Sequence, residues 1–380
     1  MILQLSDIQS AWRRLRKNKG ALAGLIVIAA AVVVSFFAYI IAPDNTPDAN
    51  RMVLEVGGQH PGFRIHMLAV KKAQPVARVS FFQRLLFGQE SDMTWTPVRS
   101  WEFKDSTLLV QRYVDETTSR EEKYNLRDVW YGSRQEAGLS IPQLQENIVR
   151  HRIFPVTYWL GTDKFGRDIL SRLLVGTRVS LGVGCIAVII SLTIGVFMGA
   201  VAGYFKGTAD DMVMWLVNVV WSMPSLLLVF ALTLALGKGF WQVFIAVGLT
   251  LWVGVARIIR GQILTLRELE FVEAARALGY GHTRIIVKHI LPNILGPVMV
   301  VAAGNFATAI VVEAGLSFLG VGVQPPQPSW GLMIKENYNF IITHNPLLAL
   351  APGVAIMMLV LAFNLLGNGL RDALDVRSKI

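Results

Sequence analysis

The chain has 380 residues, of which 53% are hydrophobic and 16% are charged, and its mean hydropathy is +0.48. An ordinary soluble domain contains about 25% charged residues, so this composition excludes a purely soluble protein. The formal net charge is +10. Because many of the basic residues flank apolar segments, membrane topology accounts for the charge, and nucleic-acid binding is not expected.

The first 20 residues combine apolar and basic positions. Leu5, Ile8, Trp12 and Leu15 recur at helical spacing, with Arg and Lys on the other faces. This pattern predicts an amphipathic helix within 1–20 on the cytoplasmic surface of the membrane, although a plain basic flank would have the same composition. The apolar stretch 21–42 is longer than a cleavable signal core of about 7 to 15 residues, so we expect an uncleaved first span.

Six stretches lack Asp, Glu, Lys, Arg and His and are long enough to cross a bilayer core, which takes roughly 20 helical residues. They are 21–41, 179–205, 212–237, 239–256, 290–312 and 345–370. Lys and Arg are concentrated before the first span, in the connection 257–288 and near the C-terminus. The positive-inside rule therefore places both termini, including the tail 376–380, in the cytoplasm. We expect an all-α membrane protein with six transmembrane helices.

Residues 43–178 form a long connection that would lie on the extracytoplasmic side. Short β-prone segments occur at 52–56, 63–70, 94–103 and 107–114, separated by Gly, Pro and charged residues. From Ile141 the pattern becomes helical, and the apolar residues between 169 and 174 predict a helix resting on the outer membrane interface. We therefore expect a small β-containing insertion followed by an interfacial helix.

The connection between the fourth and fifth spans, about 257–292, has a helical pattern interrupted by glycine. Gly279 should end a first helix, because a left-handed residue terminates helices, and Thr283 should begin a second. Ala274 and Ala275 would let another protein approach the backbone closely, and Glu273 beside them supplies one directed charge. This pattern alone fits either a rigid docking element or an ordinary cytoplasmic linker.

Two features lie within the spans. The glycines at 195, 199 and 203 form a stripe of small residues that predicts close helix packing. Glu313 follows the fifth apolar stretch, where a carboxylate either borders a translocation path or hydrogen-bonds a neighbouring helix.

Patterns that carry catalysis or metal binding are missing from the sequence. The six histidines show no ligand spacing, and there is no phosphate-binding G-x-x-x-x-G-K-[ST] loop and no H-E-x-x-H. The single cysteine, Cys185, forms no intrachain disulfide. We expect no catalytic residue, no metal and no cofactor bound by this chain.

Several motifs resemble the dipeptide/oligopeptide branch of bacterial ABC importers, in particular its C-type permease. The sequence FVEAARALG at 271–279, followed by ILP at 290–292, resembles the EAA loop that marks membrane subunits of these importers. The runs at 160–178, 260–267, 313–320, 325–331 and 369–375 resemble other parts of the same subunit. The resemblance covers most of 158–375 and the N-terminal anchor.

The resemblance implies a type I permease in the bacterial inner membrane, with a five-helix core at 179–375. It implies a heterodimer with a B-type permease, two ABC ATPases that bind ATP-Mg, and a periplasmic or lipoprotein solute-binding protein. The residues that would couple to an ATPase are Glu273, Ala274, Ala275, Gly279, Leu291 and Pro292.

This chain departs from the family pattern at two places. In the third span the family commonly has an Arg and an Asp where this chain has Trp215 and Asn218. Asn218 at this place, together with Glu313, is a candidate for the translocation path. The sequence around Trp221 and an insertion at 58–139 are similar to Yej-type peptide permeases.

Two functions of other classes compete with the importer. One is a secondary transporter driven by an ion gradient, with Glu313 as the proton carrier. The other is a sensory or structural membrane protein whose insertion binds a ligand. Neither one requires the docking element at 257–292, which favours the importer. The sequence leaves the imported solute undetermined.

Overall fold

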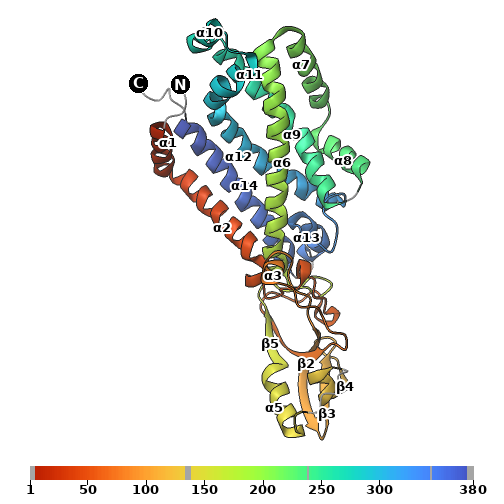
Figure 1. The fold of residues 1–380 in the computed structure, drawn as a ribbon. Coiled ribbons are helices and arrows are strands. Elements are labelled where there is room, and N and C mark those ends of the chain that lie inside the picture. Colours follow the sequence, from red (N-terminus) through yellow and green to blue (C-terminus); the bar gives the residue numbers. More distant parts are fainter. Residues whose placement is uncertain (1–4, 133–137, 238, 343–344, 375–380) are drawn as a thin grey trace.

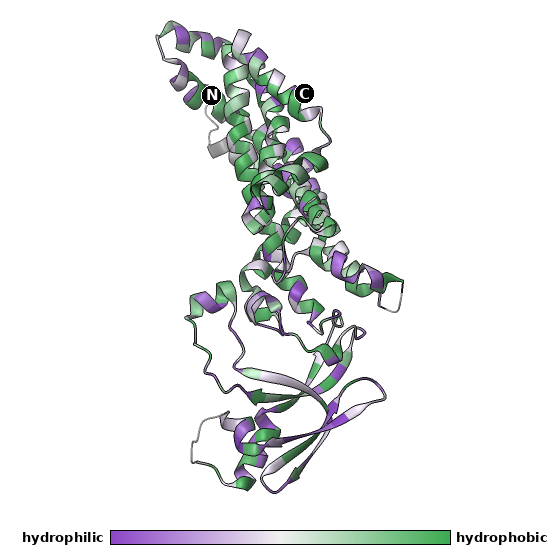
Figure 2. Cartoon of the chain, turned by 90° about the vertical axis from the view of Figure 1, so that its right-hand side faces the viewer, coloured by the Kyte–Doolittle hydropathy of each residue, from purple (hydrophilic) through white to green (hydrophobic). Residues whose placement is uncertain are grey.

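The computed structural model describes residues 5–132, 138–237, 239–342 and 345–374. A bundle of long helices occupies one part of the molecule and an antiparallel β-sheet projects from one end of it (Figure 1). In Figure 2 the bundle is mainly hydrophobic, whereas polar residues are frequent in the sheet and at the opposite tip of the bundle. The expected tail 376–380 lies outside the described residues.

Five helical segments within the described residues are long and apolar enough to cross a membrane. They are α2 (Lys19–Ile41), α6 (Ile169–Phe205), α9 (Phe240–Leu266), the segment His282–Leu319, and α14 (Leu347–Leu374). The segment His282–Leu319 comprises α11 (His282–Ile285), a π-helical turn (Ile286–Ile290), a 3₁₀ turn (Leu291–Ile294) and α12 (Leu295–Leu319). These segments confirm the mostly helical membrane architecture.

The third predicted span, 212–237, is not a straight helix. It divides into α7 (Gly207–Trp221) and α8 (Ser225–Leu236), which meet at an angle of 93°. Pro224 lies directly before α8 and cannot donate the backbone hydrogen bond that a continuous helix needs. The predicted span is therefore divided into two helices, which we call the broken span, and the described residues hold six candidate spans when this bent pair is counted as one.

The insertion contains a five-stranded sheet with the strand order β4-β3-β2-β1-β5. Its strands, all paired antiparallel, are β1 (Phe63–Lys71), β2 (Met93–Lys104), β3 (Thr107–Tyr113), β4 (Ser119–Asn125) and β5 (Ile153–Tyr158). Helices α4 (Leu126–Tyr131) and α5 (Ile141–His151) bury Val129, Leu144 and Ile148 against Leu68 and Leu108 of the sheet. The insertion thus has a hydrophobic core of its own.

Three of the four predicted strands are confirmed as β1, β2 and β3. The fourth, at 52–56, was wrong, because residues Leu54–Val56 form a 3₁₀ turn. The sequence did not predict β4 and β5, which are the two edge strands. β4 is almost entirely polar and β5 contains Pro155, both typical of edges and both weak strand signals.

The expected interfacial helix at 169–174 is not a separate element. These residues are the first turns of α6, which runs without interruption to Phe205. Asp168 caps this helix by accepting a hydrogen bond from the backbone nitrogen of Ser171 at 2.9 Å. Arg172 in these first turns is a good helix former, and its side chain pairs with Glu336 at 3.0 Å.

Close packing of α6 on α9 confirms the predicted role of the glycine stripe. A Cβ atom at Gly199 would lie 2.6 Å from the carbonyl oxygen of Ala256, and one at Gly195 would lie 2.4 Å from Cβ of Val255. Gly203 faces Ile263 in the same way. Because glycine has no side chain, the backbones of α6 and α9 approach each other closely. These two helices form the centre of the bundle.

The N-terminal segment forms α1 (Leu5–Lys17), as predicted, and Asn18 caps the following helix α2. Leu15 is buried with Ala21 of α2 and Ala373 of α14, whereas Trp12 is 48% exposed. Figure 1 places α1 and the helix α10 (Glu270–Ala277) at the end of the bundle that is opposite to the sheet.

Candidate functional site

The predicted docking element begins after α9 ends at Leu266. Helix α10 (Glu270–Ala277) follows, and Gly279 adopts φ +77°, so the predicted left-handed termination is confirmed. The next helix, α11, begins at His282 with Gly281 as its cap, one residue earlier than the predicted start at Thr283. We call the segment from α10 to the 3₁₀ turn, residues 270–294, the coupling loop.

One side of the coupling loop is buried against the bundle. Val272 and Ala275 of α10 pack with Ile285 and Ile290, and the cluster continues to Ile263 of α9. The side chains of Glu273 and Ala274 are exposed, and so is Gly279. Of the two predicted alanines, Ala275 therefore holds α10 in place and Ala274 leaves an open surface beside the Glu273 carboxylate.

Polar contacts fix the loop to the end of α6. The hydroxyl of Tyr204 lies 3.0 Å from Nδ1 of His282, and Arg267 donates to the carbonyl oxygen of Tyr204 at 2.5 Å. The guanidinium of Arg284 lies 4.0 Å from the centroid of the Tyr280 ring, which stacks on His289. Tyr204 is 78 residues from His282 and 63 residues from Arg267, so no local pattern could have identified these two contacts.

Leu291 and Pro292, the remaining predicted coupling residues, lie in the 3₁₀ turn Leu291–Ile294 and are half-buried. They do not join the exposed edge formed by Glu273 and Ala274. Their position connects the coupling loop to α12, so a displacement of the loop also reaches that helix.

Ion pairs join the broken span to α9 near the same end. Nε and Nη2 of Arg260 donate to the two carboxylate oxygens of Asp210 at 2.5 and 2.6 Å. Such a bidentate pair fixes direction as well as distance. Lys206 and Glu268 form a second, exposed pair at 2.8 Å. Helices α6, α7 and α9 and the coupling loop are thus one connected unit.

Asn218 lies on α7 with an exposed side chain, and its Oδ1 accepts a hydrogen bond from Nη2 of Arg257 at 3.2 Å. The Arg257 guanidinium also lies 3.6 Å from the centroid of the Trp221 ring. The neighbouring Trp215 is 67% exposed. A cation from α9 therefore lies beside Asn218, where the sequence predicted the loss of a charge pair.

Glu313 occupies the interior of the folded chain. Its side chain is 1% exposed and its carboxylate accepts a hydrogen bond from Oγ of Ser317 at 2.6 Å. Ser317 Oγ in turn accepts from the backbone nitrogen of Val323. The structure thus connects Glu313 to the turn that follows α12, and it does not bring Glu313 and Asn218 together at an exposed surface.

A buried ionic cluster lies at the opposite end, where the insertion meets the bundle. Arg167 pairs with Asp163 at 2.6 Å and with Glu336 at 2.8 Å, and Arg172 pairs with the same Glu336 oxygen. Both arginines are 1% exposed. The cluster ties the loop before α6 to α13 (Trp330–Asn337). The sequence showed the two arginines and Asp163 only as part of a family motif and did not indicate Glu336.

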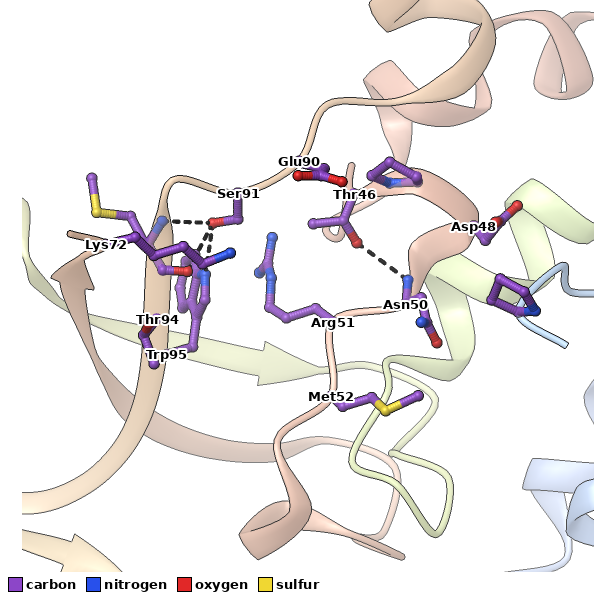
Figure 3. Close-up of a pocket in the computed structure, with 13 residues that line it drawn as sticks. Thr46, Asp48, Asn50, Arg51, Met52, Lys72, Glu90, Ser91, Thr94 and Trp95 are labelled. Carbon is purple, nitrogen blue, oxygen red and sulfur yellow. Dashed lines mark hydrogen bonds between the residues drawn. The ribbon is translucent and has the colours of Figure 1, made fainter. Parts of the chain in front are cut away.

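Beside this cluster is an open cavity of about 520 Å³ between the insertion and the bundle (Figure 3). Arg51 extends into it, where its guanidinium pairs with Asp44 at 3.2 Å and lies 4.1 Å from the Trp95 ring centroid. Burial raises the pKa of Asp48 on its wall, and the charge of Arg172 partly opposes that rise. Both acidic and basic side chains line the cavity, so its charge does not indicate one class of ligand.

Among the described residues no group of His, Cys, Asp and Glu is arranged to hold a metal ion. The candidate spans define a multi-pass membrane protein. Residues 192–380 match the family described as "Binding-protein-dependent transport system inner membrane component". Residues 6–55 match the "N-terminal TM domain of oligopeptide transport permease C". The chain belongs to the dipeptide/oligopeptide ABC permease family of the bacterial inner membrane.

Three relatives illustrate this membership. The glutathione transport system permease protein GsiD of Pectobacterium atrosepticum is 41% identical over 222 residues, which are 58% of this chain and 73% of the relative. The oligopeptide permease protein OppC of Bacillus subtilis is 41% identical, covering 57% and 71%. The dipeptide permease protein DppC of Alkalihalophilus pseudofirmus is 42% identical, covering 58% and 73%.

Among solved structures, the MetNI methionine ABC transporter in an inward-facing conformation is similar with a TM-score of 0.45 and 20% identity, covering 54% of this chain and 97% of that one. The two family matches leave residues 56–191 uncovered, so the sheet lies outside both.

Proposed function

We propose that this chain is one transmembrane half of an ATP-driven importer of peptides. Its partners are a B-type permease, two cytoplasmic ATPases that bind ATP-Mg, and a solute-binding protein on the outer side. The names of the relatives support the substrate class, since glutathione, dipeptides and oligopeptides are all peptides. Membership of a binding-protein-dependent family favours this importer over a secondary transporter driven by an ion gradient.

The proposed orientation has both termini and the coupling loop in the cytoplasm and the sheet outside. Arg284 and Lys288 of the coupling loop and Arg14, Arg16 and Lys17 of α1 are at the same end of the bundle. This concentration of basic residues agrees with the positive-inside rule.

The exposed edge of α10 is the proposed contact with the ATPase. Its exposure is the observation on which the proposal rests. Glu273 and Ala274 face outward from a helix whose other side is anchored to α9 through Val272 and Ala275. A partner ATPase that grips this edge would move α9, and α6 would follow because the glycine stripe leaves no space for sliding. Rigid elements of this kind transmit domain closure.

Of the two residues predicted to border the translocation path, Asn218 fits that role better in this arrangement. Its side chain is exposed on α7 and holds Arg257, so the pair offers an amide and a cation to a polar solute. Glu313 is enclosed, and its hydrogen bond to Ser317 gives it a structural role at the end of α12.

Glu273→Lys tests the coupling role directly. We expect uptake to fall at least about tenfold, because inverting a charge at an interface opposes docking. The variant should still insert into the membrane, since Glu273 makes no buried contact. The measurement is uptake of a labelled peptide by cells that carry the complete transporter.

Glu102→Lys is the matched control, because it makes the same charge change at an exposed position of the sheet. Uptake should remain close to that of the unchanged protein in the control. Equal uptake by both variants would remove Glu273 from the coupling contact.

A further inference from the structure

Helix α3 (Phe81–Phe87) has a surface unlike the rest of the insertion. Within these seven residues, Phe81, Phe82 and Phe87 are 66%, 73% and 67% exposed, and Leu86 is 40% exposed. We call these four side chains the aromatic patch. Exposed large apolar groups gathered on one short helix mark an interaction surface.

Several contacts fix α3 at the outer end of α2. Nη1 of Arg178 donates to the carbonyl oxygen of Leu86 at 2.7 Å, and its guanidinium lies 5.1 Å from the ring centroid of Tyr39 in the last turn of α2. The backbone nitrogen of Gln89 donates to the carbonyl oxygen of Asn45 at 3.0 Å. The patch therefore lies at the level where the first span ends at Ile41.

The apolar surface of α2 continues toward this patch. Phe36, Phe37, Ile40 and Ile41 of α2 are each between 40% and 53% exposed. α2 is a candidate membrane span with only 17% of its apolar window buried inside the protein. Figure 1 shows α3 beside the lower end of α2, between the bundle and the sheet. The outward side of α2 is a lipid-facing surface, and α3 extends it at the membrane boundary.

Polar groups on α3 complete the pattern. Leu85 is buried on the protein side, while Arg84 and the preceding Arg78 are exposed beside the patch. A short helix that exposes aromatic residues around its buried Leu85, with arginines beside them, suits the boundary between acyl chains and phosphate headgroups. The capping box formed by Ser80 and Gln83 satisfies the first turn of this helix without a partner protein.

We propose that the aromatic patch of α3 inserts into the outer leaflet of the membrane and binds phospholipid. This contact attaches the insertion to the bilayer surface at a second point beside α2. It holds the connection between β1 and β2, residues 72–92, against the membrane, independently of the imported solute.

The chain has one cysteine, Cys185, so a single substitution gives a cysteine-free background for site-specific labelling. In a Cys185→Ser background, Phe82→Cys carries a fluorescent nitrobenzoxadiazole label, and Ser119→Cys on the exposed strand β4 carries the same label as a control. The full chain, with the subunits that accompany it, is placed in nanodiscs of phosphatidylethanolamine and phosphatidylglycerol. One set of discs contains a lipid with a spin label at its headgroup.

We expect the spin-labelled lipid to reduce the emission of the Phe82→Cys reporter about twofold and to leave the Ser119→Cys reporter unchanged. Iodide in the buffer should quench the second reporter and spare the first. Iodide quenching of both reporters would overturn the proposal, since the patch would face water. Protection of the first reporter from both quenchers would overturn it too, since protein would cover the patch. Phe87→Cys repeats the measurement if Phe82→Cys impairs folding.

Discussion

At the residue scale, Gly279 shows how one backbone conformation shapes the coupling loop. Its φ of +77° ends α10, and a Cβ atom there would meet no other atom within 4 Å. The requirement is therefore conformational and not steric. A β-branched residue in this region costs roughly 1 to 3 kcal/mol, whereas asparagine tolerates it better.

We accordingly expect Gly279→Asn to keep most of the uptake activity and Gly279→Val to lose most of it, because only the second strains the turn between α10 and α11. Peptide uptake, normalised to the amount of protein in the membrane, measures the difference. Similar uptake by the asparagine and valine variants would show that the left-handed turn is not what the loop requires.

Single residues of the site were predictable from sequence only where a local pattern marks them. Glu273 and Gly279 belong to a short motif with a fixed spacing, which can be recognised in a single sequence. The pairs Tyr204–His282 and Asp210–Arg260 are each joined across at least 50 residues, and their meeting depends on how α6, α7 and α9 pack. The hydrophobic periodicity of a helix predicts which of its faces is buried, but it does not predict which polar groups on different helices will meet.

At the scale of elements, the contact between α6 and α9 is the central joint of the bundle. Gly199→Leu should destabilise the protein by roughly 2 to 3 kcal/mol, because the new side chain overlaps the backbone of Ala256 and the Cβ of Ile259. Thermal unfolding of the purified protein in detergent measures the effect.

Gly182→Leu is the control for this prediction. Gly182 lies on the same helix, and a Cβ atom there would meet nothing within 4 Å. Its midpoint of unfolding should stay near that of the unchanged protein. An equal loss of stability in both variants would mean that close contact with α9 is not what Gly199 provides, because helix propensity favours leucine over glycine at both positions.

Most helices were predictable because an apolar run of spanning length has few alternatives. The exceptions have physical causes. The bend between α7 and α8 depends on how Pro224 is accommodated, and a proline in a span either kinks or breaks the helix. The edge strands β4 and β5 carry charges or a proline, so only their pairing with β3 and β1 reveals them.

At the scale of the whole molecule, the coupling loop and the sheet lie at opposite ends of the bundle (Figure 1). A Cys185→Ser protein with Ser119→Cys should react with a membrane-impermeant maleimide in intact spheroplasts. With Ala274→Cys it should react only after the membrane is opened, because the proposed orientation places α10 in the cytoplasm. The reverse order of labelling would invert the proposed orientation.

The central claim is that this chain works only as part of an ATP-driven complex. The most direct measurement is affinity purification of the tagged chain from its native membrane in mild detergent, with identification of the accompanying polypeptides and an assay of vanadate-sensitive ATPase activity. We predict that a second permease and ATPases with Walker motifs accompany the chain, and that Glu273→Lys weakens the hold on an ATPase. A chain recovered alone, inactive towards ATP, and able to transport peptide under a pH gradient would contradict the account.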